Sequence, residues 1–264
     1  MSGDEAMVLL ISGVAAVVGW HWWYRAALVR TLIVRSASRS IFLIGPVVCL
    51  ALLCAVLRLW AADDVRNSGL YTTFYMVAGA AWVGLVAPLY GFWGISPRDD
   101  AVERQNPAAA FATLGALAGV TFCFAGGNVG NGPGWWVVVF SAALATGVLL
   151  GLWALVEWWT GISESVTVER AAGAGLRLGG FLAGTGLILG RSVAGDWVSA
   201  AATVRDFVGM AGPVLPLAVA AVLIERLLPL DESAPTEGSV TGLLLGVAYV
   251  AVSSFYVFVV RGMP

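Results

Sequence analysis

The stretch "ERQNPAAAFATLGALAG" covers residues 103–119, and a similar stretch, "ERAAGAGLRLGGFLAG", covers residues 169–184. Each begins with an acidic-basic pair, passes through a short polar or small-residue step, and enters a run of Ala, Gly and Leu. Apolar runs of this length are typical of helices that cross a membrane. The repetition therefore predicts a helix-entry motif that the chain uses more than once.

The composition of the whole chain is that of an integral membrane protein. Of its 264 residues, 59% are apolar and 11% are charged, whereas soluble domains carry about 25% charged residues. Irregular backbone cannot face lipid, so helices are the expected spanning elements. We predict an all-α, polytopic transmembrane helical bundle that forms a single integral membrane domain, residues 1–264, in the cell membrane. About eight spans are expected, near residues 6–24, 41–62, 71–94, 107–127, 135–159, 172–195, 208–228 and 240–261.

The distribution of arginine predicts the orientation, because positive residues favour cytoplasmic connections. Alternate connections, together with Arg226 at the end of the seventh span, hold eight arginines against five on the opposite side. We therefore predict that both termini lie outside. The connections expected on the cytoplasmic side are 25–40, 95–106, 160–171 and 229–239.

The opening motif has two weaker relatives, "RSASRSIFLIGPVV" at 35–48 and "PTEGSVTGLLLGVAYV" at 235–250. The four stretches are spaced by about 65–68 residues, with one span before each. A unit of two spans repeats in the same orientation, so the spacing predicts internal two-helix parallel repeats about an axis along the membrane normal. We expect the even-numbered spans to be the inner helices.

Glycines four residues apart mark these even-numbered spans. Helices in lipid gain little from hydrophobic contact with each other, so close van der Waals approach through small residues matters more. We expect these glycines to form packing faces, and the alternative is that small residues are simply abundant in such a chain. The glycines concerned are Gly115, Gly119, Gly180, Gly184, Gly242 and Gly246.

Residues 71–207 resemble the membrane family called domain of unknown function 350. Its pattern is an acidic-basic pair, a Gly-Asn step, small residues and then Gly on an apolar helix; Gln105 here replaces the usual Gly, and Ala172 stands where the second copy would have Asn. The resemblance implies no established activity, only an association with membrane stress. The residues that fit the first copy are Glu103, Arg104, Asn106, Ala108 and Gly115.

No catalytic or ligand-binding constellation is evident. His21 is the only histidine, and one histidine cannot build a multi-ligand metal site or a nucleophile-base pair by itself. We therefore expect no enzyme activity, no metal and no cofactor, and the absence of a basic block predicts no nucleic-acid partner. The Gly-rich stretch 126–134 lacks the lysine of a phosphate loop, so we expect a tight turn in which Gly130 has little role in packing.

Ionisable residues inside spans are costly unless paired or hydrated, so two of them draw attention. Glu157 lies near the end of the fifth span, and Arg177 lies about a turn and a half inside the sixth. If these spans form a hairpin, the two side chains lie at similar depth and are expected to pair. They are either a structural pair or, with Asn106, part of a polar path.

The sequence predicts a non-enzymatic scaffold or subunit of a membrane assembly. Its expected partners are the lipid bilayer and either further copies of itself, as a homo-oligomer, or other membrane protein subunits. The alternative is a channel or transporter for a small solute or ion, with Asn106, Glu157 and Arg177 around a path near the repeat axis. A polar cavity at the membrane midplane would favour transport, whereas a solid core with an exposed small-residue face would favour assembly.

Overall fold

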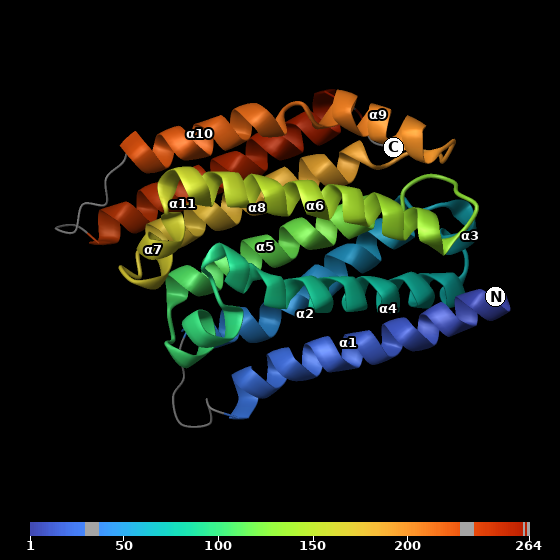
Figure 1. Cartoon of the computed structure of the whole chain (residues 1–264), viewed down its shortest axis with the longest axis horizontal. Helices are drawn as coiled ribbons and strands as arrows, with labels where there is room; N and C mark the ends of the chain where they lie inside the picture. Colours follow the sequence, from blue (N-terminus) through green and yellow to red (C-terminus); the bar gives the residue numbers. More distant parts are fainter. Residues whose placement is uncertain (30–36, 228–234, 261, 263–264) are drawn as a thin grey trace.

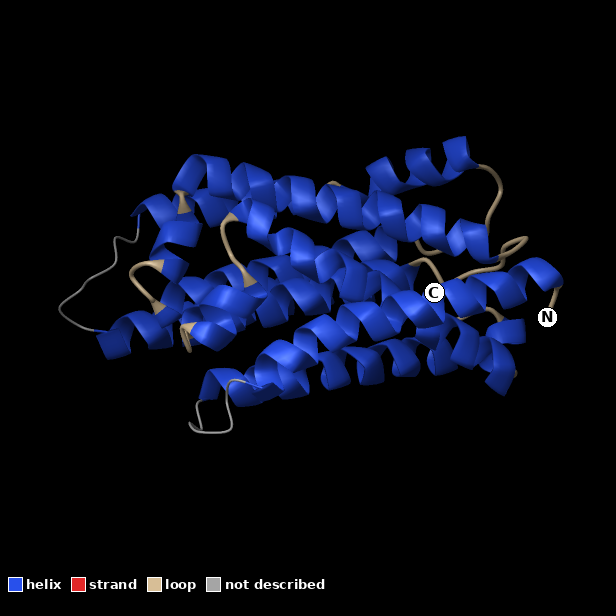
Figure 2. Ribbon diagram, turned by 60° about the horizontal axis from the view of Figure 1, so that its bottom comes forward, coloured by secondary structure: helices blue, strands red, loops and turns tan. Residues whose placement is uncertain are grey.

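A computed structural model describes residues 1–29, 37–227, 235–260 and 262 of the chain, and every regular element in them is a helix (Figures 1 and 2). The expected connections 25–40 and 229–239 lie partly outside the described residues. The longer helices are α1 (Gly3–Val29), α2 (Ala37–Leu59), α4 (Gly69–Val86), α5 (Pro107–Gly126), α6 (Trp135–Thr160), α8 (Ala172–Ser192), α9 (Ala200–Ala211), α10 (Val214–Leu227) and α11 (Pro235–Phe255). Shorter elements are α3 (Asp63–Arg66), α7 (Ile162–Thr167), the 3₁₀ helix η1 (Ala87–Trp93) and the π helices η2 (Pro97–Glu103) and η3 (Tyr256–Val260).

Seven of the described helices are long and apolar enough to cross a membrane. The expected run 107–127 coincides with α5, but the run 208–228 holds the end of α9 and all of α10, which are bent by 46°. Pro213 lies at the break, and because proline lacks a backbone N–H it cannot continue the hydrogen-bond ladder of α9. If the bent pair is one span, the described residues hold eight.

The first of two rows of helices contains α1, α4, α6 and the bent pair α9–α10 (Figure 1). Neighbours in this row are parallel, because contacts advance along both helices together: Tyr71 of α4 meets Glu5 near the start of α1, and Ala80 accepts a hydrogen bond from Trp20 further along. The row continues through hydrogen bonds from Trp82 of α4 to Thr146 of α6 and from Arg226 of α10 to Trp159 of α6. All four hydrogen bonds join residues that are 60 to 67 positions apart.

The second row contains α2, α5, α8 and α11. Its two middle helices, α5 and α8, are the core of the molecule, with 78% and 72% of their membrane-length apolar stretches buried, while the corresponding stretches of α2 and α11 at its edges have 33% and 22% buried. The even-numbered spans are therefore not all interior: two of them are central and two are peripheral. In a membrane, the exposed apolar surface of the edge helices faces lipid or another helix.

The two middle helices approach so closely that only glycine fits between them. A Cβ atom added to Gly115 would lie under 3.0 Å from the backbone of Gly179, and one added to Gly119 would lie 2.5 Å from the carbonyl oxygen of Leu182. Because higher residue numbers in α5 meet higher numbers in α8, the pair is parallel. This backbone contact is the small-residue packing by which helices associate in lipid.

The contact between α8 and α11 is of the same kind. A Cβ atom on Gly180 would meet the backbone of Gly246, and one on Gly184 would lie 2.8 Å from the carbonyl oxygen of Tyr249. Gly242 lies against Gly173 in the same way. Each of the six glycines singled out in the sequence therefore lies against the backbone of a neighbouring helix.

Two equivalent turns lead into α5 and α8. Gln105 and Arg170 both adopt left-handed backbone conformations, with φ of 52° and 59°, and each directly precedes the N-cap residue of its helix, Asn106 or Ala171. The alignment that placed Ala172 opposite Asn106 is therefore wrong by one residue. It matched the two Glu-Arg pairs, whereas the backbone matches the residues of positive φ.

Candidate functional site

Asn106 has a structural position at the end of the bundle opposite the N-terminus. Its side-chain oxygen accepts hydrogen bonds from the backbone N–H groups of Ala108 and Ala109, and its Nδ2 donates to the carbonyl oxygen of Val166 at 2.7 Å. The side chain is fully buried. It caps α5 and ties it to α7, so its hydrogen-bonding groups are occupied.

Glu157 and Arg177 do not pair with each other, which corrects the expectation for the fifth and sixth spans. The carboxylate of Glu157 accepts hydrogen bonds from Ser163, from N–H at 2.9 Å and from Oγ at 2.6 Å. Arg177 instead forms a bidentate pair with Glu225 of α10, at 2.5 and 2.6 Å, with both side chains more than nine-tenths buried. Glu157 therefore stabilises the turn that follows α6. The charge of Arg177 is neutralised by a residue of a different helix, α10.

An apolar groove runs along the outer face of the second row. One half, of about 450 Å³, is lined by α5, α8 and α11; the other, of about 340 Å³, is lined by the same helices and α2, with η3. The halves share Val250. The floor contains small residues, including Ala118 and Ala183, and Trp60 and Phe258 approach each other at 6.5 Å between ring centroids at one end. We call this feature the α5–α8 groove.

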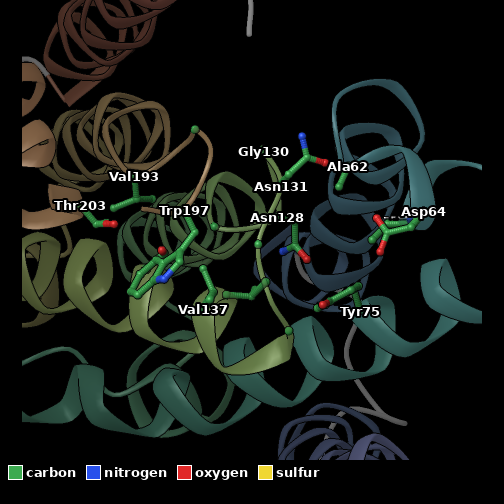
Figure 3. A pocket seen from close by; sticks show the side chains of 17 residues that line it. Ala62, Asp64, Tyr75, Asn128, Gly130, Asn131, Val137, Val193, Trp197 and Thr203 are labelled. Atoms are coloured by element: carbon green, nitrogen blue, oxygen red, sulfur yellow. Dashed lines mark hydrogen bonds between the residues drawn. The ribbon is translucent and has the colours of Figure 1, made fainter. Parts of the chain in front are cut away.

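A polar cavity of about 40 Å³ lies at the end of the bundle where α1 begins (Figure 3). It is enclosed by α3, the start of α4, the loop before α6 and the loop after α8. Asn128 stands in the middle of the view, with Asp64 and Tyr75 on one side and Trp197 on the other (Figure 3). A cavity of this size has room for about three water molecules.

Two Gly-containing loops form one wall of the cavity by bonding to each other. Asp196 accepts hydrogen bonds from both the backbone N–H and the side-chain amide of Asn131, at 2.7 and 3.1 Å. The N–H of Gly195 donates to Val129, and that of Trp197 donates to Asn131. These bonds fix the loops 127–134 and 193–199 relative to one another, so the cavity wall is a built structure.

Gly130 belongs to this wall, contrary to the expectation that it has little role in packing. Its φ is 107°, a conformation that favours glycine, and an added Cβ atom would lie under 3.0 Å from the backbone of Gly195 and Asp196. The sequence pattern identified a turn but could not indicate that a second loop folds against it.

Asn128 is the residue of this cavity that the sequence did not single out. It is 4% exposed, its Nδ2 donates to the carbonyl oxygen of Phe124 at 2.8 Å, and its Oδ1 has no hydrogen-bond partner. A buried polar atom without a partner costs about 1–3 kcal/mol. The sequence signal was an Asn in a Gly-rich loop between two spans, which does not distinguish a buried side chain from an exposed one.

The remaining observations concern metal ligands and similarity to known proteins. Within the described ranges, no three His, Cys, Asp or Glu side chains come together as a set of metal ligands. Comparison of the chain with protein-family models, with curated proteins and with solved structures gave no match. The resemblance of residues 71–207 to the family named above therefore stays a prediction.

Proposed function

We propose that this chain is a non-enzymatic scaffold or subunit of a membrane assembly, and that it associates with a second copy of itself through the α5–α8 groove. The observation that carries the proposal is the groove itself: an apolar hollow with small residues in its floor, on the outer face of the closely packed second row. Small residues on a helix surface allow another helix to approach closely, which is the main source of helix association in lipid.

Helix α11 also carries an exposed apolar ridge beside the groove. Along α11, Val240, Leu244 and Phe255 follow one stripe of the helix and are 60%, 65% and 60% exposed. A two-fold axis beside this face would lay the α11 ridge of each copy into the groove of the other. Such an interface is self-complementary and closes on itself, as in most homodimers.

The experiment changes the floor of the groove without touching the contact between α5 and α8. Ala118 and Ala183 are only half-buried and line the groove. The substitutions Ala118→Leu and Ala183→Leu replace a methyl group by a side chain of about four times its apolar bulk and so fill the groove. We expect the parent protein to be a dimer in mild detergent by light scattering, and both variants to be monomers of unchanged stability.

Ala143→Leu on α6 is the matched control. Ala143 is exposed and lies outside the groove, so the same change there should leave the dimer intact. A monomeric parent, or a dimer that persists in both groove variants, would contradict the proposal. A complex with a different protein, identified by mass spectrometry of the purified sample, would replace the second copy by that partner.

The finer features predicted from the sequence belong to the same proposal. We infer that the chain consists of four two-helix units, each in the same orientation, which the parallel neighbours and the 60-to-67-residue separation of their hydrogen bonds support. The proposal also includes an orientation in which both termini lie outside the cell membrane. It includes the resemblance of residues 71–207 to the family named above as well. The unit boundaries follow the two equivalent turns at Gln105 and Arg170.

A channel or transporter for a small solute or ion is the second candidate, favoured by the break between α9 and α10. Broken helices line substrate sites in many transporters because the ends of the half-helices expose backbone groups. At this break, however, the hydroxyl of Tyr256 donates to the carbonyl oxygen of Met210, and toward the other end of α10 Arg177 and Glu225 neutralise each other. Uptake of labelled ions into liposomes that contain the parent but not the Arg177→Gln variant would support transport over assembly.

A further inference from the structure

Asn128 is held in one orientation by its neighbour on α5. The amide nitrogen must face the carbonyl oxygen of Phe124, because that oxygen accepts a hydrogen bond and the amide oxygen could not supply one. The oxygen of Asn128 is therefore fixed away from Phe124. In the view of Figure 3 it lies on the side of Tyr75 and Asp64.

The other side-chain groups that line the cavity include one carboxylate and no cationic group. Asp64 contributes a carboxylate, while Tyr75 and Ser141 contribute hydroxyl groups; among the residues that line the cavity there is no Arg or His. The carboxylate of Asp64 is exposed at the rim and accepts a hydrogen bond from the N–H of Val65. An acceptor without a donor and a nearby negative charge together favour a cation.

We propose that this cavity binds a small monovalent cation through oxygen atoms, with Asn128 Oδ1 as the buried ligand and Asp64 as the charge that balances it. The single carboxylate among the lining residues matches one positive charge, and a divalent ion would call for more acidic ligands than the cavity offers. Oxygen acceptors and a carboxylate repel anions. A sodium ion with bound water, or the ammonium group of a primary amine, fits the volume of about 40 Å³.

Thermal unfolding of the full chain in detergent tests the site when one cation replaces another at constant ionic strength. The probes are sodium, methylammonium and choline chlorides; choline is larger and has no N–H group to donate. We expect the melting temperature to rise with sodium or methylammonium until it saturates, and to stay flat with choline. A lower half-saturation concentration for sodium identifies the bound cation as a metal ion. A lower one for methylammonium identifies it as an amine.

Variants at the two ligands make the test specific. Asn128→Leu should abolish the cation-dependent rise, and Asp64→Asn, which keeps the acceptor for Val65, should raise the half-saturation concentration at least about tenfold, as expected for loss of a close charge partner. Asp63→Asn is the matched control, because Asp63 is exposed, pairs with Arg66 and does not line the cavity. Its response should equal that of the parent.

The result that would overturn the proposal is equal behaviour of the three cations in the parent, or an Asp64→Asn variant that responds as Asp63→Asn does. Asp64 lies at the surface, so this arm gives an answer even if Asn128→Leu does not fold. Failure of this test leaves the dimer proposal untouched, because the cavity lies outside the α5–α8 groove.

Discussion

Replacement of Gly115 by alanine should separate α5 from α8. The new Cβ atom would overlap the backbone of Gly179, and no side chain is present there to rotate away, so the two helices must move apart by roughly 1 Å. A gap of that order removes a quarter to a half of the dispersion energy of each atom pair across it. Overpacking of a rigid core typically costs about 1–3 kcal/mol, and we expect the upper half of that range.

Helix propensity acts in the opposite direction and provides the control. Alanine favours a helix over glycine by up to about 1 kcal/mol, and at Gly147 of α6 no atom lies within 4 Å of the added Cβ. Gly147→Ala should therefore be neutral or stabilising, while Gly115→Ala should be clearly destabilising. The two variants contain the same chemical change, so their difference in sign isolates the contact between the helices.

Thiol labelling measures this separation directly. Cys123 on α5 is fully buried, with its sulfur 3.9 Å from the carbonyl oxygen of Gly186 on α8. In a Cys54→Ser background, reaction of the buried thiols with a maleimide dye during reversible unfolding reports both stability and opening of this contact. Equal free energies of unfolding and equal labelling rates for the Gly115 and Gly147 variants would refute the account of close backbone packing.

Three further changes test other contacts of the fold. Arg177→Gln and Glu225→Gln should each destabilise by about 3–5 kcal/mol because each leaves a buried charge unpaired; the double variant should lose less than the sum, and additive losses in unfolding experiments would mean that the pair is not coupled. Asn106→Ala should cost about 1–2 kcal/mol through the lost helix cap, visible as a lower midpoint of unfolding, and an unchanged midpoint would contradict the capping role. A cysteine in place of the exposed Pro133 should react with an impermeant thiol reagent in intact cells, and protection there would reverse the proposed orientation.

The sequence predicted the helices better than it predicted their neighbours. The run expected at 107–127 matches α5 (Pro107–Gly126) because composition and the Asn-Pro entry are local signals. The partner of Arg177 was missed because a hairpin was assumed to bring the fifth and sixth spans together at equal depth, whereas Glu225 approaches from α10. Pairing across helices depends on the arrangement of the rows, which no local pattern encodes.

The polar cavity could not be predicted for a related reason. The stretch 126–134 indicated a turn, and that much is local. The loop 193–199, however, bonds to the same stretch through Asp196 and Asn131 and lines the cavity together with Asn128, which no local pattern indicates. The break at Pro213 was not predicted either, because the run 208–228 was expected to be one span; a proline alone does not decide the matter, since Pro46 lies inside the continuous helix α2.

The parallel neighbours in both rows have a consequence for how the chain enters the membrane. Ribosomes add about 5–20 residues per second, so a helix that docks on a partner roughly 65 residues earlier emerges some 3–13 s after that partner. When α8 is inserted, the glycine face of α5 is already in the bilayer. When α11 is inserted, the glycine face of α8 is already there. Each insertion step thus completes an interface with a helix made before it, and the bundle grows from one edge toward the other in the order of synthesis.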